Sequence, residues 1–142
     1  MKCLPAVLGA VLLLTATAAS AEVLIQRDYG GQIGPYLDRF AMVRESGQRV
    51  VIDGECLSAC TLVLAVVPPE RICITPRATL GFHAAWLPDE YGRPVISRGG
   101  TQVLWRFYPA RIRHWINRHG GLTGHTIFLR GRELASMYHS CM

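Results

Sequence analysis

The sequence predicts a single α/β domain with a largely parallel sheet, and three apolar runs carry this prediction. Residues 23–26, 49–53 and 71–76 are short apolar stretches bounded by turn residues, which is the pattern of buried strands. Helical patterns follow the first two runs, so strands and helices alternate along the chain. Such alternation favours βαβ units in one compact domain.

The first predicted strand and helix are separated by a turn at residues 27–31. Apolar residues then recur at helical spacing from Ile33 to Val43, and Gly47 marks the expected end of the helix. A strand–turn–helix unit is therefore expected over residues 23–47.

The second predicted strand leads into the stretch DGECLSAC at residues 53–60. A sharp turn at Gly54 is expected there, followed by a buried helix that begins at Ser58 and includes the apolar run 62–67. Serine is a favoured residue at a helix N-cap. Helix capping is therefore the ordinary explanation for Ser58.

The remaining chain predicts shorter elements. Residues 79–83 indicate a short strand or turn, and residues 84–100 are rich in turn residues and indicate an exposed loop. Helices are expected over 101–107 and 109–118. The tail is expected to add a short strand and a terminal turn.

The N-terminus has the pattern of a secretory signal peptide. Lys2 precedes an apolar run over residues 4–19, and ASA at 19–21 is a small-x-small cleavage site. Cleavage leaves one domain at 22–142 and predicts export to the periplasm or the extracellular space. The run is short for a spanning helix, so no stable membrane insertion is expected after cleavage. An uncleaved N-terminal anchor is the alternative.

The composition argues against nucleic acid as a partner. After residue 21 the chain has fourteen arginines, no lysine and ten acidic residues, and no basic run with interleaved aromatic residues. A homo-oligomer is the candidate assembly, because the apolar stripe of the helix at 109–118 has little remaining domain to cover it.

Three chemically distinctive positions come at or just after the ends of predicted strands. Gly30-Gly31 comes after the first, Ser58 follows the second and His83 comes just after the third. Because open α/β sheets build their sites at the carboxyl edge, these groups are expected to lie together. Taken separately, each has an ordinary explanation as a turn, a helix cap or a structural histidine.

These stretches, in this order, resemble the ClpP/crotonase superfamily, and specifically small secreted relatives of ClpP-like serine peptidases. The resemblance covers VLIQRDYGGQIGPYLDRF, RVVIDGECLSACTLVLAVV and RICITPRATLGFHAAW, about half of the chain after residue 21. Gly31 precedes Ser58 by 27 residues and His83 follows it by 25, which is close to the family pattern. The resemblance implies a ClpP/crotonase-like fold.

The resemblance also implies roles for these residues. Ser58 would be the nucleophile and His83 the general base. The amide of Gly30 or Gly31, together with that of Ala59, would form the oxyanion hole.

The acid that orients the histidine is the open part of this assignment. The segment LRGRELAS resembles the acid-bearing segment of the family, but Gly131 stands where the acid is expected. Glu133, two residues further on, is the candidate, and Asp89 and Glu90 in the loop after His83 are its rivals.

Four cysteines follow residue 21, which permits two disulfides in an oxidising compartment. The favoured pairing joins Cys56 to Cys60 across Ser58 and Cys73 to Cys141, with crossed pairings left open. The cysteine and histidine spacings match no zinc site, so no metal is expected. The absence of a C-x-x-C motif makes disulfide exchange a distant alternative.

The sequence therefore predicts an exported serine hydrolase, a peptidase or a descendant of one, that acts on a peptide or a small acyl substrate without a cofactor. No nucleotide-binding loop is evident, so coenzyme A is not expected. The rival class is a non-catalytic binding module that retains the fold, and the uncertain acid favours it.

Overall fold

The structure is a computed structural model that describes residues 21–142. Nearly all of the predicted signal peptide at 1–21 therefore lies outside the described residues. Within the described part, no helix is long and apolar enough to cross a membrane.

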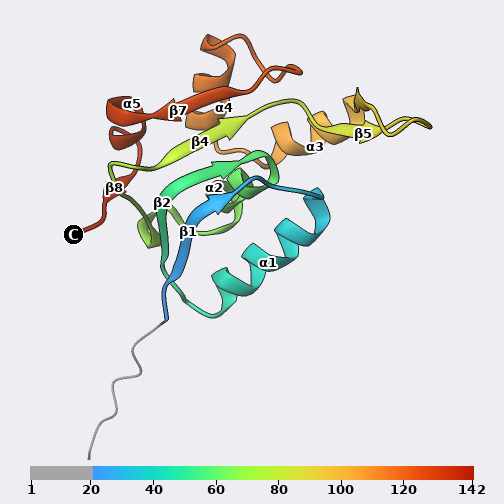
Figure 1. The fold of residues 1–142 in the computed structure, drawn as a ribbon. Coiled ribbons are helices and arrows are strands. Elements are labelled where there is room, and N and C mark those ends of the chain that lie inside the picture. Colours follow the sequence, from blue (N-terminus) through green and yellow to red (C-terminus); the bar gives the residue numbers. More distant parts are fainter. Residues whose placement is uncertain (1–20) are drawn as a thin grey trace, which may run out of the picture.

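The domain is built on a sheet in which β2 is the central strand (Figure 1). β1 lies parallel to β2 on one side, while on the other side the first half of β2 pairs with β3 and its second half with β4. The strands of this sheet are β1 (Val23–Asp28), β2 (Val50–Leu57), β3 (Ile72–Ile74), β4 (Thr79–Phe82), β7 (Ile127–Arg130) and β8 (His139–Ser140).

The prediction of a largely parallel, ClpP/crotonase-like sheet is wrong. β7 runs antiparallel to β4, and β5 (Trp86–Pro88) and β6 (Pro94–Ile96) form a separate antiparallel pair. The sheet is therefore mixed, and it curls like half of a barrel. Periodicity could not show this, because an apolar run has the same pattern whichever direction its neighbour takes.

The helices include short 3₁₀ segments. α1 packs against η1 and α2, which follow β2 directly. Their bounds are α1 (Ile33–Glu45), η1 (Ser58–Leu62), α2 (Val63–Val66), η2 (Pro69–Arg71), α3 (Arg98–Phe107), α4 (Ala110–Arg118) and α5 (Gly131–Ala135).

Two local predictions are corrected. The expected turn at Gly54 does not form, since β2 continues to Leu57. A Cβ at Gly54 would lie 2.1 Å from the Gln26 carbonyl oxygen, so the glycine permits close approach of β1 rather than a turn. The expected loop at 84–100 instead contains the β5–β6 hairpin and the start of α3.

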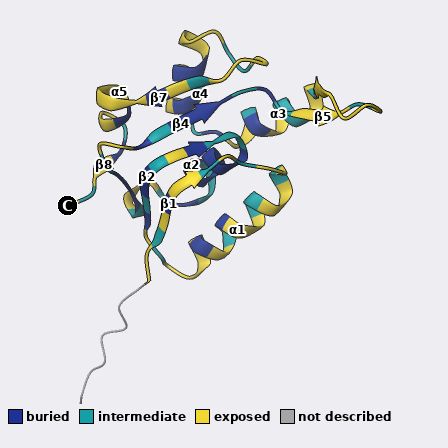
Figure 2. Ribbon diagram, viewed as in Figure 1, coloured by how far each residue is buried: buried dark blue, intermediate teal, exposed yellow. Residues whose placement is uncertain are grey.

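An aromatic cluster connects β4 to the helices that follow it. The Phe82 ring lies 5.4 Å from that of Tyr108 and 5.8 Å from that of Trp115, and all three side chains are buried. Figure 2 shows β4 coloured mostly as buried. Ile112 and Ile116 of α4 are also fully buried. The apolar stripe of α4 is therefore covered by its own domain, which removes the reason given above for expecting a homo-oligomer.

Candidate functional site

Ser58 occupies an unusual backbone position at the end of β2. It is the first residue of η1, and its φ of 55° is the only positive value at a non-glycine residue between residues 21 and 142. A left-handed conformation costs an L-residue about 1–2 kcal/mol. Conformations of this kind concentrate at functional sites, including the strand-to-helix turn that exposes a nucleophilic serine.

Helix capping does not account for Ser58. The N-cap position of η1 is Leu57, and no side chain caps this helix. The Ser58 hydroxyl makes no hydrogen bond to any described residue, whereas the Ser58 carbonyl accepts one from the Thr61 hydroxyl at 2.6 Å. The Ser58 hydroxyl is therefore available for a hydrogen bond with a bound ligand.

The Ser58 turn is held from inside the domain by a disulfide and a buried hydroxyl pair. Cys56 and Cys60, both fully buried, form a disulfide that spans Ser58. The Thr61 hydroxyl, which donates to Ser58, accepts from the Tyr108 hydroxyl at 2.7 Å. Burial raises the pKa of Tyr108 to about 12, so this donor keeps its proton across the physiological range.

Gly30 supports the same turn from the β1 side. Its φ is 80°, and a Cβ there would lie 2.6 Å from the Leu57 carbonyl oxygen and 2.7 Å from the Ala59 amide nitrogen. Asp28 fixes this glycine, because its carboxylate accepts a hydrogen bond from the Gly30 amide at 3.0 Å. Only glycine can adopt this φ and approach the Ser58 turn this closely without a steric clash.

The same geometry shows which of the predicted oxyanion-hole amides already have a hydrogen-bond acceptor. The Gly30 amide donates to Asp28 and is not available to a substrate. The Gly31 amide has no acceptor among the described residues, and Ala59 lies at the second position of η1, where helical amides lack an intrahelical acceptor. Gly31 and Ala59 are therefore the donors that could stabilise an oxyanion beside Ser58.

His83 follows the last residue of β4. Its Nδ1 lies 2.7 Å from the Ala84 carbonyl oxygen. Because a carbonyl oxygen can only accept, Nδ1 carries the proton in this hydrogen bond, which leaves Nε2 of the neutral ring as the acceptor. No hydrogen bond joins Ser58 to His83 in this structure, although both residues line the same pocket.

None of the three candidate acids forms a hydrogen bond or an ion pair with His83. Glu133 on α5 accepts from Trp115 Nε1 at 3.2 Å and lies 3.9 Å from His119 Nε2. Asp89 is engaged within the hairpin, where hydrogen bonds from Arg93, first from its amide, lower the Asp89 pKa. Glu90 is exposed beside it. None of the three contributes to the pocket that contains Ser58.

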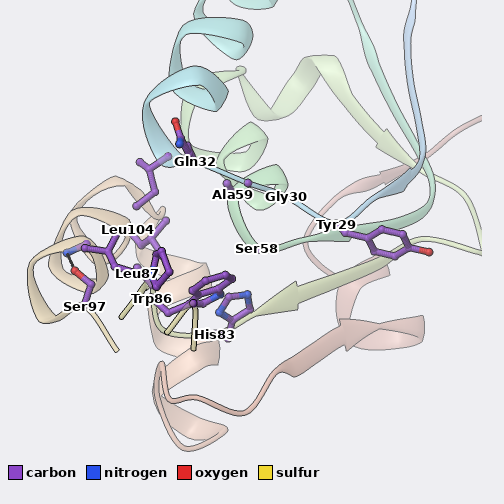
Figure 3. A pocket seen from close by; sticks show the side chains of 16 residues that line it. Tyr29, Gly30, Gln32, Ser58, Ala59, His83, Trp86, Leu87, Ser97 and Leu104 are labelled. Atoms are coloured by element: carbon purple, nitrogen blue, oxygen red, sulfur yellow. Dashed lines mark hydrogen bonds between the residues drawn. The ribbon is translucent and has the colours of Figure 1, made fainter. Parts of the chain in front are cut away.

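We call the cavity that contains these residues the Ser58 pocket (Figure 3). It has a volume of about 690 Å³, within the range of small-molecule sites. Its lining includes no Asp, Glu, Lys or Arg. The lining residues are Tyr29 to Ile33, Ser58, Ala59, His83, Ala85 to Pro88, Gly92, Ser97, Gly100 and Leu104.

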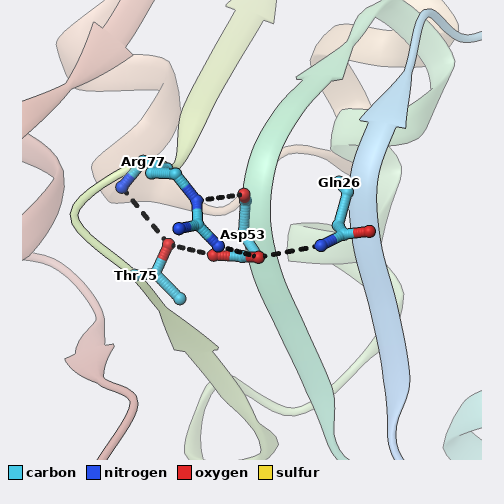
Figure 4. A network of polar contacts seen from close by, with 4 residues as sticks. All are labelled: Gln26, Asp53, Thr75 and Arg77. Atoms are coloured by element: carbon cyan, nitrogen blue, oxygen red, sulfur yellow. Dashed lines mark hydrogen bonds and ion pairs between the residues drawn. The ribbon is translucent and has the colours of Figure 1, made fainter.

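A second polar cluster surrounds Asp53, outside the Ser58 pocket (Figure 4). Its carboxylate, 9% exposed, accepts hydrogen bonds from Gln26 at 3.1 Å, from Thr75 at 2.7 Å and from Arg77. The bond from Gln26, followed by those from Thr75 and Arg77, lowers the pKa of Asp53 to about 2. The carboxylate oxygens are occupied by protein donors, so this cluster ties β1 and the β3–β4 turn to β2.

Both predicted disulfides are confirmed. Cys56 pairs with Cys60 and Cys73 with Cys141, with Cα–Cα distances of 5.3 and 5.0 Å. Two disulfides are consistent with an exported protein, because they persist in oxidising compartments. Among residues 21–142, no three His, Cys, Asp or Glu side chains are grouped as metal ligands.

Comparison with known proteins adds no assignment: no family model matches the chain, and no curated protein does either. The roles suggested for Ser58, His83 and the two amides therefore depend on local geometry and on the motifs themselves.

Two contacts at the candidate site were missed at the level of sequence. Asp28 precedes Gly30 by two residues, and an aspartate that accepts from the amide two positions on is a common turn pattern that could have been noticed. The Ala84 carbonyl has no sequence signal, because any residue supplies one. Only the fold shows that the Ala84 carbonyl, and none of the three candidate acids, is hydrogen-bonded to His83.

The two disulfides should rank in opposite order for their effects on stability and on the reactivity of Ser58. Chain entropy predicts a loss of about 4 kcal/mol for C73A/C141A, which opens a 68-residue separation, and about 2 kcal/mol for C56A/C60A, which opens a separation of four. Reaction of Ser58 with a fluorophosphonate should nevertheless slow more in C56A/C60A. Denaturant unfolding and labelling rates check this, and labelling losses that simply follow the stability losses would contradict it.

Gly30→Ala should slow labelling of Ser58 by about tenfold to 100-fold, because the added Cβ displaces the turn that presents it. Gly34→Ala is the matched control, since its Cβ meets no atom within 4 Å and alanine favours the helix. Equal labelling rates for the two variants would show that Gly30 does not position Ser58.

Asp53→Asn should flatten the acid limb of the stability curve. The folded pKa of about 2 lies below the unfolded value of about 3.9, so Asp53 stabilises the fold above pH 4 and this contribution is lost as the pH falls toward 2. Thermal unfolding at pH 2 to 7 measures it. Asp38→Asn removes an exposed carboxylate of α1 as a control, and an unchanged pH slope in Asp53→Asn would contradict the assignment.

Proposed function

We propose that this chain is an exported serine hydrolase that cleaves an ester, thioester or amide bond, with Ser58 as nucleophile and His83 as general base. The observation that carries the proposal is the backbone of Ser58, held at positive φ with its hydroxyl unbonded in the pocket that contains His83. A protein that used this serine only for packing would have no reason to maintain a conformation that costs free energy.

The proposed reaction follows from the available atoms. The Ser58 hydroxyl oxygen attacks the substrate carbonyl carbon while its proton passes to His83 Nε2, and the Gly31 and Ala59 amides donate to the oxyanion. His83 returns the proton to the leaving group as the scissile bond breaks. Water then attacks the acyl-serine while losing a proton to His83, and His83 returns this proton to Ser58 Oγ as the acyl–serine bond breaks and the acid leaves.

The Ala84 carbonyl supplies one part of what an orienting acid does. It holds His83 in the tautomer with a free Nε2, and loss of the correct tautomer is what makes removal of the acid so costly in the serine-protease triad. A neutral carbonyl stabilises the imidazolium less than a carboxylate does. We therefore expect a slow enzyme whose histidine has the correct tautomer.

Export and substrate class complete the proposal. The small-x-small motif before Glu22 and the two disulfides support secretion to the periplasm or beyond. The three sequence motifs that resemble those of ClpP-like peptidases support a peptide or a small acyl compound as substrate. We propose this resemblance for the motifs only, because the sheet of this domain is mixed.

The second candidate is a non-catalytic binding module. It is favoured by two observations: Ser58 makes no hydrogen bond to His83, and no acidic residue lines the pocket. Catalytic hydrogen bonds are often incomplete without substrate, so the chemical reactivity of Ser58 is the property that separates the two functions.

A fluorophosphonate probe distinguishes them. The protein that begins at Glu22 should be labelled at one residue, and Ser58→Ala should abolish labelling because the phosphonyl group bonds to its Oγ. Ser97→Ala is the matched control, since Ser97 lies in the same pocket but its hydroxyl accepts from the Gly100 amide at 3.1 Å. Absence of labelling in the unaltered protein, or persistent labelling of Ser58→Ala, would exclude the nucleophile assignment.

A further inference from the structure

The β5–β6 hairpin is attached firmly beside His83. The Ala84 amide donates to the Thr123 carbonyl at 2.7 Å, and the Ser97 amide donates to the Ala85 carbonyl at 2.8 Å. The Ala85 amide donates to the Thr101 hydroxyl at 3.1 Å. β5 therefore extends from His83 in a defined direction and projects from the domain (Figure 1).

The hairpin exposes large apolar side chains at the mouth of the Ser58 pocket. Trp86 is 50% exposed and Leu87 63% exposed, and both line the pocket together with Pro88. Leu104 of α3, which is 3% exposed, lines the same cavity. An apolar surface continuous with a cavity is the pattern of a site that binds an apolar ligand.

The polar groups of the pocket indicate which apolar ligand fits. The lining has no Asp, Glu, Lys or Arg, and the Ser97 hydroxyl already accepts from Gly100. Beyond the candidate serine and histidine, its other polar side chains, Tyr29 and Gln32, adjoin Gly30 and Gly31 in the sequence, so the wall formed by β5 and Leu104 is apolar. Pro88 has no backbone N–H group, so β5 lacks a hydrogen-bond donor at this residue. A peptide carries an amide donor and an acceptor at every residue, and burying these groups without partners is unfavourable. A chain with no polar group beyond its carbonyl meets no such penalty.

We propose that the Ser58 pocket binds an unbranched acyl chain, with the chain against β5 and Leu104 and the carbonyl beside the Gly31 and Ala59 amides. The position of the scissile bond rests on the hydrolase function proposed above, whereas binding of the chain does not. The substrate class is then an acyl ester or thioester, and β5 is the element that determines specificity for it.

Binding is tested in Ser58→Ala, so that the result does not depend on catalysis. Trp86 is half exposed in the pocket, whereas Trp115 is 1% exposed, so titration with octanoate should shift tryptophan emission to shorter wavelength. Adding Trp86→Phe should remove the shift, and adding Trp105→Phe, which is outside this pocket, should preserve it. An acetylated, amidated hexa-alanine peptide should produce no shift.

A charge on β5 provides the second variant. Leu87→Asp should weaken octanoate binding by about tenfold or more, because a carboxylate would replace apolar contact with the chain. Leu24→Asp is the matched control, since Leu24 is a leucine of β1 that is 53% exposed and lies outside the pocket lining. Equal weakening by the two variants would overturn the assignment of β5 as the specificity element.

Turnover provides the last readout. The unaltered protein should hydrolyse p-nitrophenyl octanoate with a kcat/KM about tenfold or more above that for the acetate, because the longer chain buries more apolar surface. Octanoate binding without fluorophosphonate labelling would reject the hydrolase and retain the acyl site. Labelling without octanoate binding or chain-length preference would reject the acyl site and retain the hydrolase, and binding of the peptide instead would overturn the acyl class.

Discussion

The contact between Gly30 and the Ser58 turn is the constraint on which the candidate site depends. Two backbone segments from different strands approach so closely that a single Cβ at Gly30 would lie within 2.7 Å of three atoms of the turn. Asp28 holds one segment, and the Cys56–Cys60 disulfide spans the other. Because both sides are fixed, Ser58 can be maintained in a backbone conformation that an unsupported serine would leave.

The partner change along β2 explains how the other groups reach Ser58. The first half of β2 pairs with β3, and its second half pairs with β4, so His83 at the end of β4 is brought to the edge where β2 ends. β1 pairs with β2 up to Cys56, which brings Gly30 and Gly31 to the same edge. The antiparallel β7 and the Phe82 aromatic cluster then fix β4 from its far side.

The surroundings of His83 combine features of an enzyme and of a binding protein. The Ala84 carbonyl sets the tautomer that general-base chemistry needs, but no carboxylate is present to stabilise a charged ring. The apolar hairpin beside it favours ligand binding whether or not a bond is cleaved. Both proposed functions use the Ser58 pocket. They differ in whether Ser58 and His83 form a hydrogen bond once a ligand is bound.

The sequence by itself determined the local units of this protein. Apolar periodicity identified β1, α1 and the start of β2, since burial of one face leaves a direct pattern in the residues. The cysteine pairing favoured from the sequence is the one observed, and Gly30, Gly31, Ser58, Ala59 and His83 were singled out and do lie around one pocket.

The tertiary structure alone decided how these units are used. Strand direction, the continuation of β2 through Gly54 and the hairpin at 86–96 depend on which segments pair, and pairing is set by contacts between residues distant in sequence. The same reason applies to the acid that was expected to orient His83. Glu133 accepts a hydrogen bond from Trp115 and Asp89 accepts one from Arg93, while Glu90 is exposed to solvent, so none of the three is bonded to His83. Residue types determine which chemistry is possible, whereas the fold determines which residues lie close together.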